Sequence, residues 1–177
     1  MKHLVKIILI SFLVLIVSRT QAQNLSTTIK VQAMDMATAF MNNNLDAFIK
    51  YMHPDIIAYA GGKEQMKTKL DSAYVAMKQF GVSFKRYWIG SPGEIIDYKD
   101  QLQALLPQTT TMNTLLGEIV VETTMIAISK DQGKNWWFID TNVYRVNKLK
   151  DILPDLSPKL VIPPPKQPKF SPADINH

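Results

Sequence analysis

The chain has 177 residues, no cysteine, and 20 basic against 15 acidic residues, which gives a formal net charge of +5. The lack of cysteine excludes disulfides, thiolate metal ligands, a cysteine nucleophile and a lipid anchor on an N-terminal cysteine. The basic residues are scattered among the acidic ones, without a stripe or an interleaved aromatic platform, so the composition argues against nucleic-acid binding.

Residues 1–22 have the pattern of a cleavable export signal. Two lysines precede a run of mostly apolar residues at 7–17, and residues 20–22 form a small-x-small cleavage site. The apolar run is shorter than the roughly 20 residues that a membrane-spanning helix needs, so we expect cleavage rather than a membrane anchor. We therefore predict a periplasmic or secreted protein that begins at Gln23 and carries neither a lipid anchor nor a membrane segment.

The predicted mature chain is nearly neutral. It has 155 residues, of which 17 are basic and 15 acidic, for a net charge of +2. This length suits one domain with a hydrophobic core, which we place at residues 23–153. The rest, residues 154–177, is a proline-rich C-terminal tail.

Apolar residues at helical spacing predict three helices in the first half of the domain, at residues 26–41, 45–52 and 63–80. The second helix should end at His53, because a residue before proline is pushed out of the helical region. Residues 56–60 are typical of a short strand, and two glycines then turn the chain into the third helix.

After Gly81 the period changes to two, which predicts strands at 83–89, 94–98, 114–129 and 135–143. Residues 101–106 either extend the second of these strands or pair separately. In the strand at 114–129 the odd positions carry no charge, whereas the even positions include Glu118 and Glu122. We expect the odd face to pack inward and the even face to meet water or a partner.

The end of the chain differs in kind. A helical turn at residues 149–153 closes the domain, and seven of the ten prolines then fall between Pro154 and Pro172. Such a segment favours an extended, polyproline-like conformation without ladder hydrogen bonds of its own. Residues 160–162 are apolar and should lie along the surface of the domain.

One short motif stands out, the Ser-x-Asp-x-Gly-x-x-Trp pattern of the Asp box, formed by Ser129, Asp131, Gly133 and Trp136. Asp131 is placed to bond the turn amides, and Gly133 supplies a positive φ. Sugar-handling propellers carry several such hairpins, but this chain has a single copy and no propeller repeat. We therefore interpret the motif as a structural hairpin.

Other candidate chemistry is sparse. Glu118, Glu122 and Asp140 are candidates for paired carboxylates, but the strand face that carries the two glutamates looks solvated, which disfavours catalysis. After cleavage the only histidines are His53 and His177, and neither stands in a metal-binding spacing. We expect no metal site and no cofactor, and the catalytic residues stay undefined.

The order of elements resembles the nuclear-transport-factor-2-like (SnoaL-like) superfamily over residues 28–145. The likeness is carried by residues 37–40, 44–46, 53–55 and 61–63, which include the His-Pro-Asp and Gly-Gly-Lys stretches. The resemblance implies an α+β, cone-shaped fold, with N-terminal helices packed in a strongly curved antiparallel β-sheet. It also implies a pocket at the open end and dimerisation through the sheet.

Enzymatic members of that superfamily place Asp, His or Tyr inside the cone, but none of their motifs matches this chain position by position. Tyr59, Trp88 and Tyr98 are our candidates for pocket-lining residues. Residues 131–170, with Leu-Pro-Asp-Leu-Ser-Pro at 153–158, also resemble a group of small exported bacterial proteins of unknown function.

Three functions remain open. We expect first an exported, non-catalytic binding module for a small apolar ligand or a protein partner, forming a homodimer. The alternative is a cofactor-independent isomerase, lyase or hydrolase that uses general acid/base catalysis in the cone pocket. The third is a structural protein with the tail as a docking strap. A deep pocket with a desolvated acid or histidine opposite a tyrosine would favour the enzyme, and a cavity filled by its own aromatics would oppose it.

Overall fold

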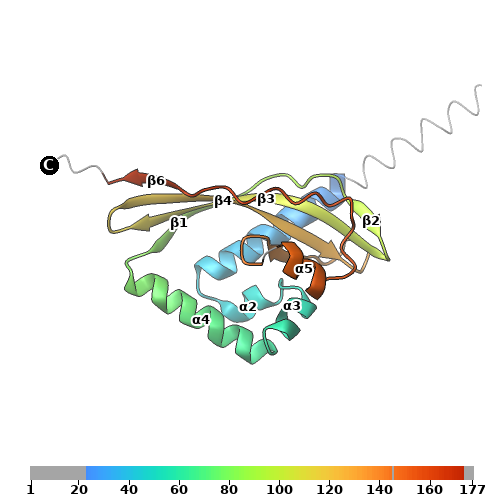
Figure 1. The fold of residues 1–177 in the computed structure, drawn as a ribbon, viewed down its shortest axis with the longest axis horizontal. Coiled ribbons are helices and arrows are strands. Elements are labelled where there is room, and N and C mark those ends of the chain that lie inside the picture. Colours follow the sequence, from blue (N-terminus) through green and yellow to red (C-terminus); the bar gives the residue numbers. More distant parts are fainter. Residues whose placement is uncertain (1–22, 145, 174–177) are drawn as a thin grey trace, which may run out of the picture.

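The computed structural model describes residues 23–144 and 146–173, and the predicted export signal lies outside them. The fold is α+β: helices pack against a curved antiparallel sheet that does not close, as predicted (Figure 1). Residues 23–41 are helical. The elements that follow are α2 (Leu45–Ile49), α3 (Pro54–Tyr59), α4 (Lys63–Gln79), β1 (Ser83–Ile89), β2 (Ile96–Tyr98), β3 (Gln101–Thr114), β4 (Gly117–Ser129), β5 (Trp137–Asp140), α5 (Val146–Ile152) and β6 (Lys169–Pro172).

The long β3–β4 hairpin forms the centre of the sheet. The strand order is β1-β3-β4-β5, β2 pairs with β3, and β6 pairs with β4. The hairpin turns at residues 115–116, so β4 begins three residues later than the predicted strand. The open question at residues 101–106 is also answered, since these residues belong to the 14-residue strand β3, which pairs with both β2 and β1.

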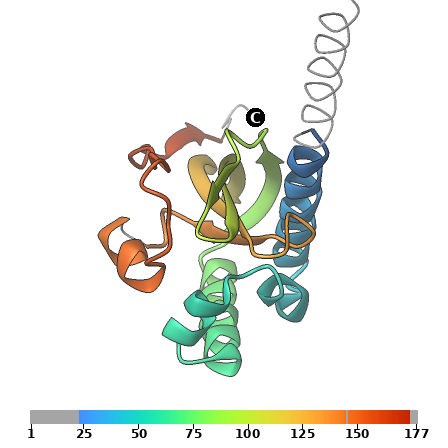
Figure 2. The ribbon, with the colours of Figure 1, turned by 90° about the vertical axis from the view of Figure 1, so that its right-hand side faces the viewer.

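One face of the sheet, the inner face, packs on the N-terminal helix. Ile29, Ala33 and Met36 of that helix form one buried cluster with the inner face of the sheet. The strand residues of this cluster are Ile89, Ala104, Leu106, Met125, Ala127 and Phe138. Figure 2 shows the blue N-terminal helix and the orange helix α5 on opposite sides of the curled sheet.

The opposite, outer face is covered at one end by α5 and the start of the tail. Ile126 and Ile128 are buried there against four leucines and two isoleucines from residues 149–162. Gln103 is fully buried on this face: its Nε2 donates to the Asp155 carbonyl at 2.7 Å, and its Oε1 accepts from Ser157 N–H at 2.8 Å. The even face of β4, predicted to meet water or a partner, is therefore part of the protein's own core at this end.

The tail departs from the expectation that it makes no ladder hydrogen bonds. Its last described strand, β6, adds to the edge of β4 in antiparallel register, with Phe170 opposite Ile119. Both Lys166 and Lys169 bond the Glu122 carboxylate at 2.6 Å, and they lower the pKa of Glu122 to about 2. Partnering the open edge of β4 protects it from pairing with another chain.

Residues 56–60 were predicted as a strand, and this prediction is wrong, because residues 56–59 belong to helix α3 and Ala60 is its C-cap. Pro54 stands in the first turn, where its missing N–H is not needed, and His53 caps the helix through Nδ1, which accepts from Asp55 N–H at 3.2 Å. The short apolar run at 56–60 fits the period of a helix and that of a strand. The capping residues at 53–55 therefore determine that it is helical.

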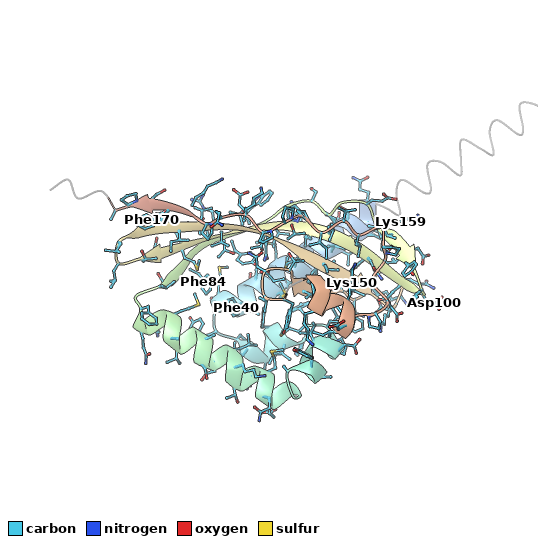
Figure 3. All side chains as sticks on the ribbon, viewed as in Figure 1. Phe40, Phe84, Asp100, Lys150, Lys159 and Phe170 are labelled. Atoms are coloured by element: carbon cyan, nitrogen blue, oxygen red, sulfur yellow. The ribbon has the colours of Figure 1, made fainter. Side chains whose placement is uncertain are left out.

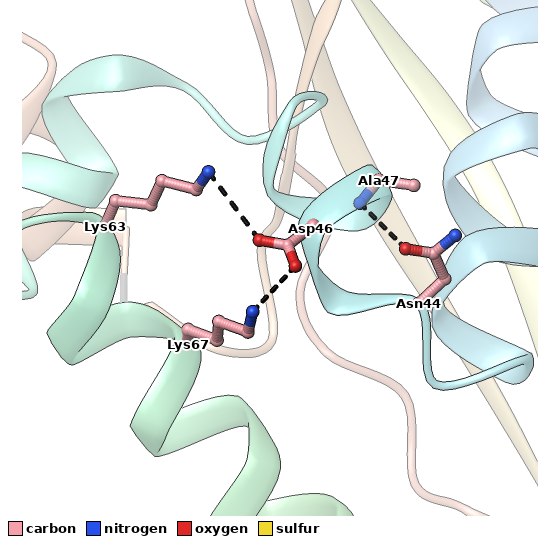
Figure 4. Close-up of polar contacts among 5 residues, drawn as sticks. All are labelled: Asn44, Asp46, Ala47, Lys63 and Lys67. Carbon is pink, nitrogen blue, oxygen red and sulfur yellow. Dashed lines mark hydrogen bonds and ion pairs between the residues drawn. The ribbon is translucent and has the colours of Figure 1, made fainter.

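Helices α2 and α4 are joined by a charged contact (Figure 4). Asp46 follows the N-cap Asn44, whose side chain accepts from Ala47 N–H at 3.2 Å. Its carboxylate lies 2.7 Å from Lys67 Nζ and 3.6 Å from Lys63 Nζ, and the Lys67 hydrogen bond lowers the pKa of Asp46. All three groups are exposed, so we expect a weak contact that salt screens.

Candidate functional site

An apolar cavity of about 300 Å³ lies between the helices and the inner face of the sheet. The N-terminal helix, α2, α3 and α4 form its helical wall, and β1, β3, β4 and β5 supply its floor. Phe40 and Phe84, which meet across it with ring centroids 5.3 Å apart, are labelled in Figure 3 between α4 and the strands. Its apolar lining consists of Met36, Ala37, Phe40, Phe48, Met52, Ile56, Met66, Leu70, Phe84, Met125, Phe138, Ile139 and Val143.

A row of polar side chains crosses the inner face at this cavity. Tyr87 of β1 donates its O–H to Gln108 Oε1 of β3. Gln108 Nε2 in turn donates to Asp140 Oδ2 of β5 at 2.6 Å and to the hydroxyl of Thr123 on β4. Tyr87, Gln108 and Asp140 line the cavity together with Thr110 and Tyr144. The cavity is thus mostly apolar, and a continuous row of hydrogen-bonded side chains forms its one polar end.

Within residues 23–144 and 146–173, Asp140 is the only charged residue that lines the cavity. Besides Gln108, its Oδ2 accepts from Thr123 at 3.4 Å and its Oδ1 accepts from Asn142 N–H at 2.8 Å. Burial raises the pKa of Asp140 above its ordinary value, while these donors oppose the rise. Since each of these neighbours presents a donor, the arrangement suits the ionised carboxylate.

Burial also raises the pKa of the Tyr87 phenol well above its usual range, and the nearby Asp140 charge adds to the effect. Tyr87 is therefore a neutral hydrogen-bonding group over the whole physiological pH range. A desolvated acid and a tyrosine thus face one cavity, joined through Gln108, which is the arrangement that we expect to favour an acid/base enzyme.

A bulge in β1 brings two aromatic residues into the cavity. The register between β1 and β3 shifts between Phe84 and Arg86, so that Phe84 lies opposite Met112 and Tyr87 opposite Thr110. Phe84 and Tyr87 then share the inner face although they are three residues apart. A strict period of two would place them on opposite faces, which is why alternation alone missed this pair.

The three pocket-lining candidates from the sequence lie away from this cavity. Tyr59 is 53 % exposed near the end of α3, where Lys148 Nζ lies 5.0 Å from its ring centroid. Trp88, also 53 % exposed, lines a separate hollow on the outer face beside Pro163 and Thr124. Tyr98 lines a third hollow, against the start of the tail. These residues are candidates only because they are aromatic. The strand register and the bulge in β1, in contrast, place Tyr87 in the cavity.

The candidate carboxylates are not brought together. Glu118 pairs with Lys85, and Glu122 pairs with two lysines of the tail. Asp140 lies instead opposite Met125 and lines the cavity. The solvated interpretation therefore fits the two glutamates, but Asp140 belongs to the inner face.

The Asp box forms a hairpin that is tied to the N-terminal helix. Asp131 accepts from Ser129 Oγ at 2.8 Å and from Asn135 N–H at 2.9 Å, and Ser129 Oγ accepts from Gly133 N–H at 2.9 Å. Trp136 is 1 % exposed, and its Nε1 donates to the Gly133 carbonyl at 3.0 Å. Its backbone N–H also donates to the Gln32 side chain at 2.8 Å.

Other sites are weaker candidates. A larger hollow, about 530 Å³, lies beside the Asp-box hairpin and has mostly polar walls, which include Asp97, Asp100 and Lys130. Among residues 23–144 and 146–173 no group of three or more His, Asp or Glu is placed to hold a metal ion. No helix in the same ranges is long and apolar enough to cross a membrane.

Comparisons of the chain with known protein families, with curated proteins and with solved structures find no match. The cavity and its polar row are therefore the features of the molecule that bear on its function.

Proposed function

We propose that the protein is an exported binding module for a small, mostly apolar molecule, which occupies the cavity between the helices and the inner face. The observation that carries this proposal is the combination of an apolar space of about 300 Å³ with a single polar edge. Ligand pockets commonly have apolar walls that give affinity and a few placed polar groups that fix orientation.

Binding is favoured over catalysis because the polar groups are largely occupied with one another. Asp140 accepts hydrogen bonds from Gln108, Thr123 and the backbone of Asn142, which limit the rise in its pKa and fix its rotamer. Tyr87 donates its only proton to Gln108. The row is thus suited to orienting a ligand.

A calorimetric titration with 4-phenylbutanol, a neutral probe with an apolar body and one polar head, tests the proposal. The purified protein should bind it with 1:1 stoichiometry. Ala37→Leu, which extends a side chain from the buried cavity wall, should weaken binding about tenfold or more, equivalent to about 1.4 kcal/mol. Leu70→Trp, on the facing wall, is the second filling variant in case the first does not fold.

Val31→Leu is the matched control, because it enlarges an exposed side chain on the same helix as Ala37. It should bind the probe as the parent protein does. The absence of heat of binding in the parent protein, or equal affinities in the parent and both filling variants, would show that the cavity is not the binding site.

The second candidate is a cofactor-independent enzyme, an isomerase, lyase or hydrolase that works by general acid/base catalysis. The raised pKa of Asp140 favours it, since a carboxyl group shifted towards neutral pH is a better proton acceptor. The test is turnover of a probe bound in the cavity. If Asp140 is the general base, Asp140→Asn should abolish turnover of the probe while the probe still binds.

We also propose that the chain is a divergent member of the nuclear-transport-factor-2-like superfamily, exported after cleavage of residues 1–22, and that it dimerises through its sheet. The order of helices, the curved antiparallel sheet and the cavity between them support the first part. The charge and hydropathy pattern of residues 1–22 supports the second. The half-exposed Trp88 and Phe170 support the third.

A further inference from the structure

The polar row of the cavity has a direction, and that direction follows from Asp140. An ionised carboxylate only accepts hydrogen bonds, so the Gln108 amide must turn its NH₂ group towards it. The amide oxygen then faces Tyr87, which makes the phenol the donor of that bond. The chain of donors therefore runs from Tyr87 through Gln108 to Asp140, and the reverse direction would set an amide oxygen against a carboxylate.

This direction decides which hydrogen bonds remain for a ligand. Both protons of the Gln108 NH₂ group are used, one on Thr123 and one on Asp140, and the only proton of the Tyr87 hydroxyl is used on Gln108. Thr123 donates to Asp140. Free lone pairs remain on Gln108 Oε1 and on the Asp140 carboxylate, and a further one remains on the Tyr87 oxygen beside its hydrogen bond with Thr110. The row thus offers acceptors, while the hydroxyls of Thr110 and Tyr144 can play either role.

Charge points the same way. Among the described residues that line the cavity, Asp140 is the one with a charge, so this part of the lining has a negative end. A ligand carboxylate would place a second negative charge beside Asp140 in a desolvated site, which is unfavourable. A ligand carbonyl would face acceptors with its own lone pairs. A cation that donates hydrogen bonds meets both the charge and the free lone pairs.

We propose that the cavity selects ligands with a hydrogen-bond-donating, cationic head on an apolar body, and that a protonated primary amine is the best fit. This inference rests on the proposed binding function and specifies the chemical class of its ligand. The net charge of the chain is positive both with and without residues 1–22, so long-range attraction by the whole protein does not explain a preference for a cation. The preference must arise at Asp140 and its row.

The test compares three probes that share one body and differ only in the head: 4-phenylbutylamine, 4-phenylbutanol and 4-phenylbutyrate. We expect affinity to fall in that order, with the amine about tenfold or more tighter than the carboxylate. In Asp140→Asn the affinity for the amine should fall about tenfold, whereas that for the alcohol should change less than about threefold. Tyr87→Phe, which removes one acceptor without changing charge, should weaken amine binding too.

Glu122→Gln is the matched control, since it removes one negative charge from the outer face without touching the cavity. It should leave the order of the three probes unchanged. Equal affinity for all three heads, or tightest binding of the carboxylate, overturns this inference while the binding function stands. If none of the three binds, the binding function itself fails. Should Asp140→Asn not fold, Tyr87→Phe and the parent protein still decide the order.

Discussion

At the scale of single residues, the structure separates groups that hold the fold from groups that face the cavity. Ser129 and His53 are buried and bonded to the backbone of their own turns, whereas Tyr87 and Asp140 line a cavity. Substituting the first pair should therefore change stability, and substituting the second should change ligand binding.

Ser129→Ala tests the structural role of the Asp-box hairpin. The hydroxyl is fully buried, donates to Asp131 and accepts from Gly133 N–H, so its loss leaves a buried backbone donor without a partner. The free energy of unfolding should drop by about 1–3 kcal/mol in urea denaturation, with no change in binding of the cavity probes. Ser91→Ala, at an exposed serine, is the control and should stay within about 0.5 kcal/mol.

His53 should make the protein sensitive to acid. The residue is 2 % exposed, and burial lowers its pKa to about 4 from the usual 6.5, against the opposing charge of Asp55. Between these two values the unfolded chain binds more protons than the native protein, so stability must fall as the pH falls. From pH 7 to pH 5 the loss at this residue should be about 2 kcal/mol.

His53→Asn keeps a side chain that caps a helix and removes the titration. Urea denaturation at pH 7 and pH 5 should show a smaller loss in this variant than in the parent protein, by about 2 kcal/mol. Equal losses in both proteins would mean that His53 is not held neutral by burial.

At the scale of the elements, local signals predict the helices well and the strands less completely. Helix α4 and strand β1 lie where their periodicity placed them. Helix α3 was mistaken for a strand because five apolar residues fit both periods, and the caps at 53–55 decide the structure.

The polar row could not be assembled from the sequence, because its members meet through pairing between strands far apart in the chain. Gln108 lies opposite Thr123, and Asp140 opposite Met125, so the contacts depend on register. Alternation from Leu106 does place Gln108 on the inner face. A predicted strand that continued beyond residue 106 would therefore have placed Gln108 correctly. The bulge between Phe84 and Arg86 left no such signal.

The tail can be tested by graded truncation. Ending the chain at Pro165 removes β6 and both lysine contacts to Glu122, which are exposed, so the melting temperature should change little. Ending it at Pro154 removes the partners of Gln103, and it removes Leu156, Leu160 and Ile162 from the cluster that contains Ile126. Unsatisfied and uncovered groups of this kind cost several kcal/mol, so the melting temperature should fall by about 10 °C or more.

Equal melting temperatures for the full chain and the chain that ends at Pro154 would contradict the docked arrangement of residues 155–162, and would show a free linker instead. The chain that ends at Pro165 is the control, because it also lacks the exposed end of the tail but keeps the contacts of Gln103.

At the scale of the whole molecule, the two ends of the sheet differ in how their faces are covered. At one end both faces are buried, by the N-terminal helix and by α5 with the tail. At the other end the inner face holds the cavity, and the outer face carries the exposed Trp88. If the protein dimerises through this outer face, Trp88→Lys should convert the dimer to a monomer in sedimentation velocity without altering ligand affinity.

The most direct test of the binding function uses the methionines as reporters. Met36, Met52, Met66 and Met125 line the cavity, whereas Met34 and Met77 do not. In a titration of ¹³C-methyl-methionine protein with 4-phenylbutylamine, the four cavity methyl signals should shift together and saturate, while the signals of Met34 and Met77 stay in place. Unchanged cavity signals, or equal shifts at all methionines, would contradict the assignment of this cavity as a binding site.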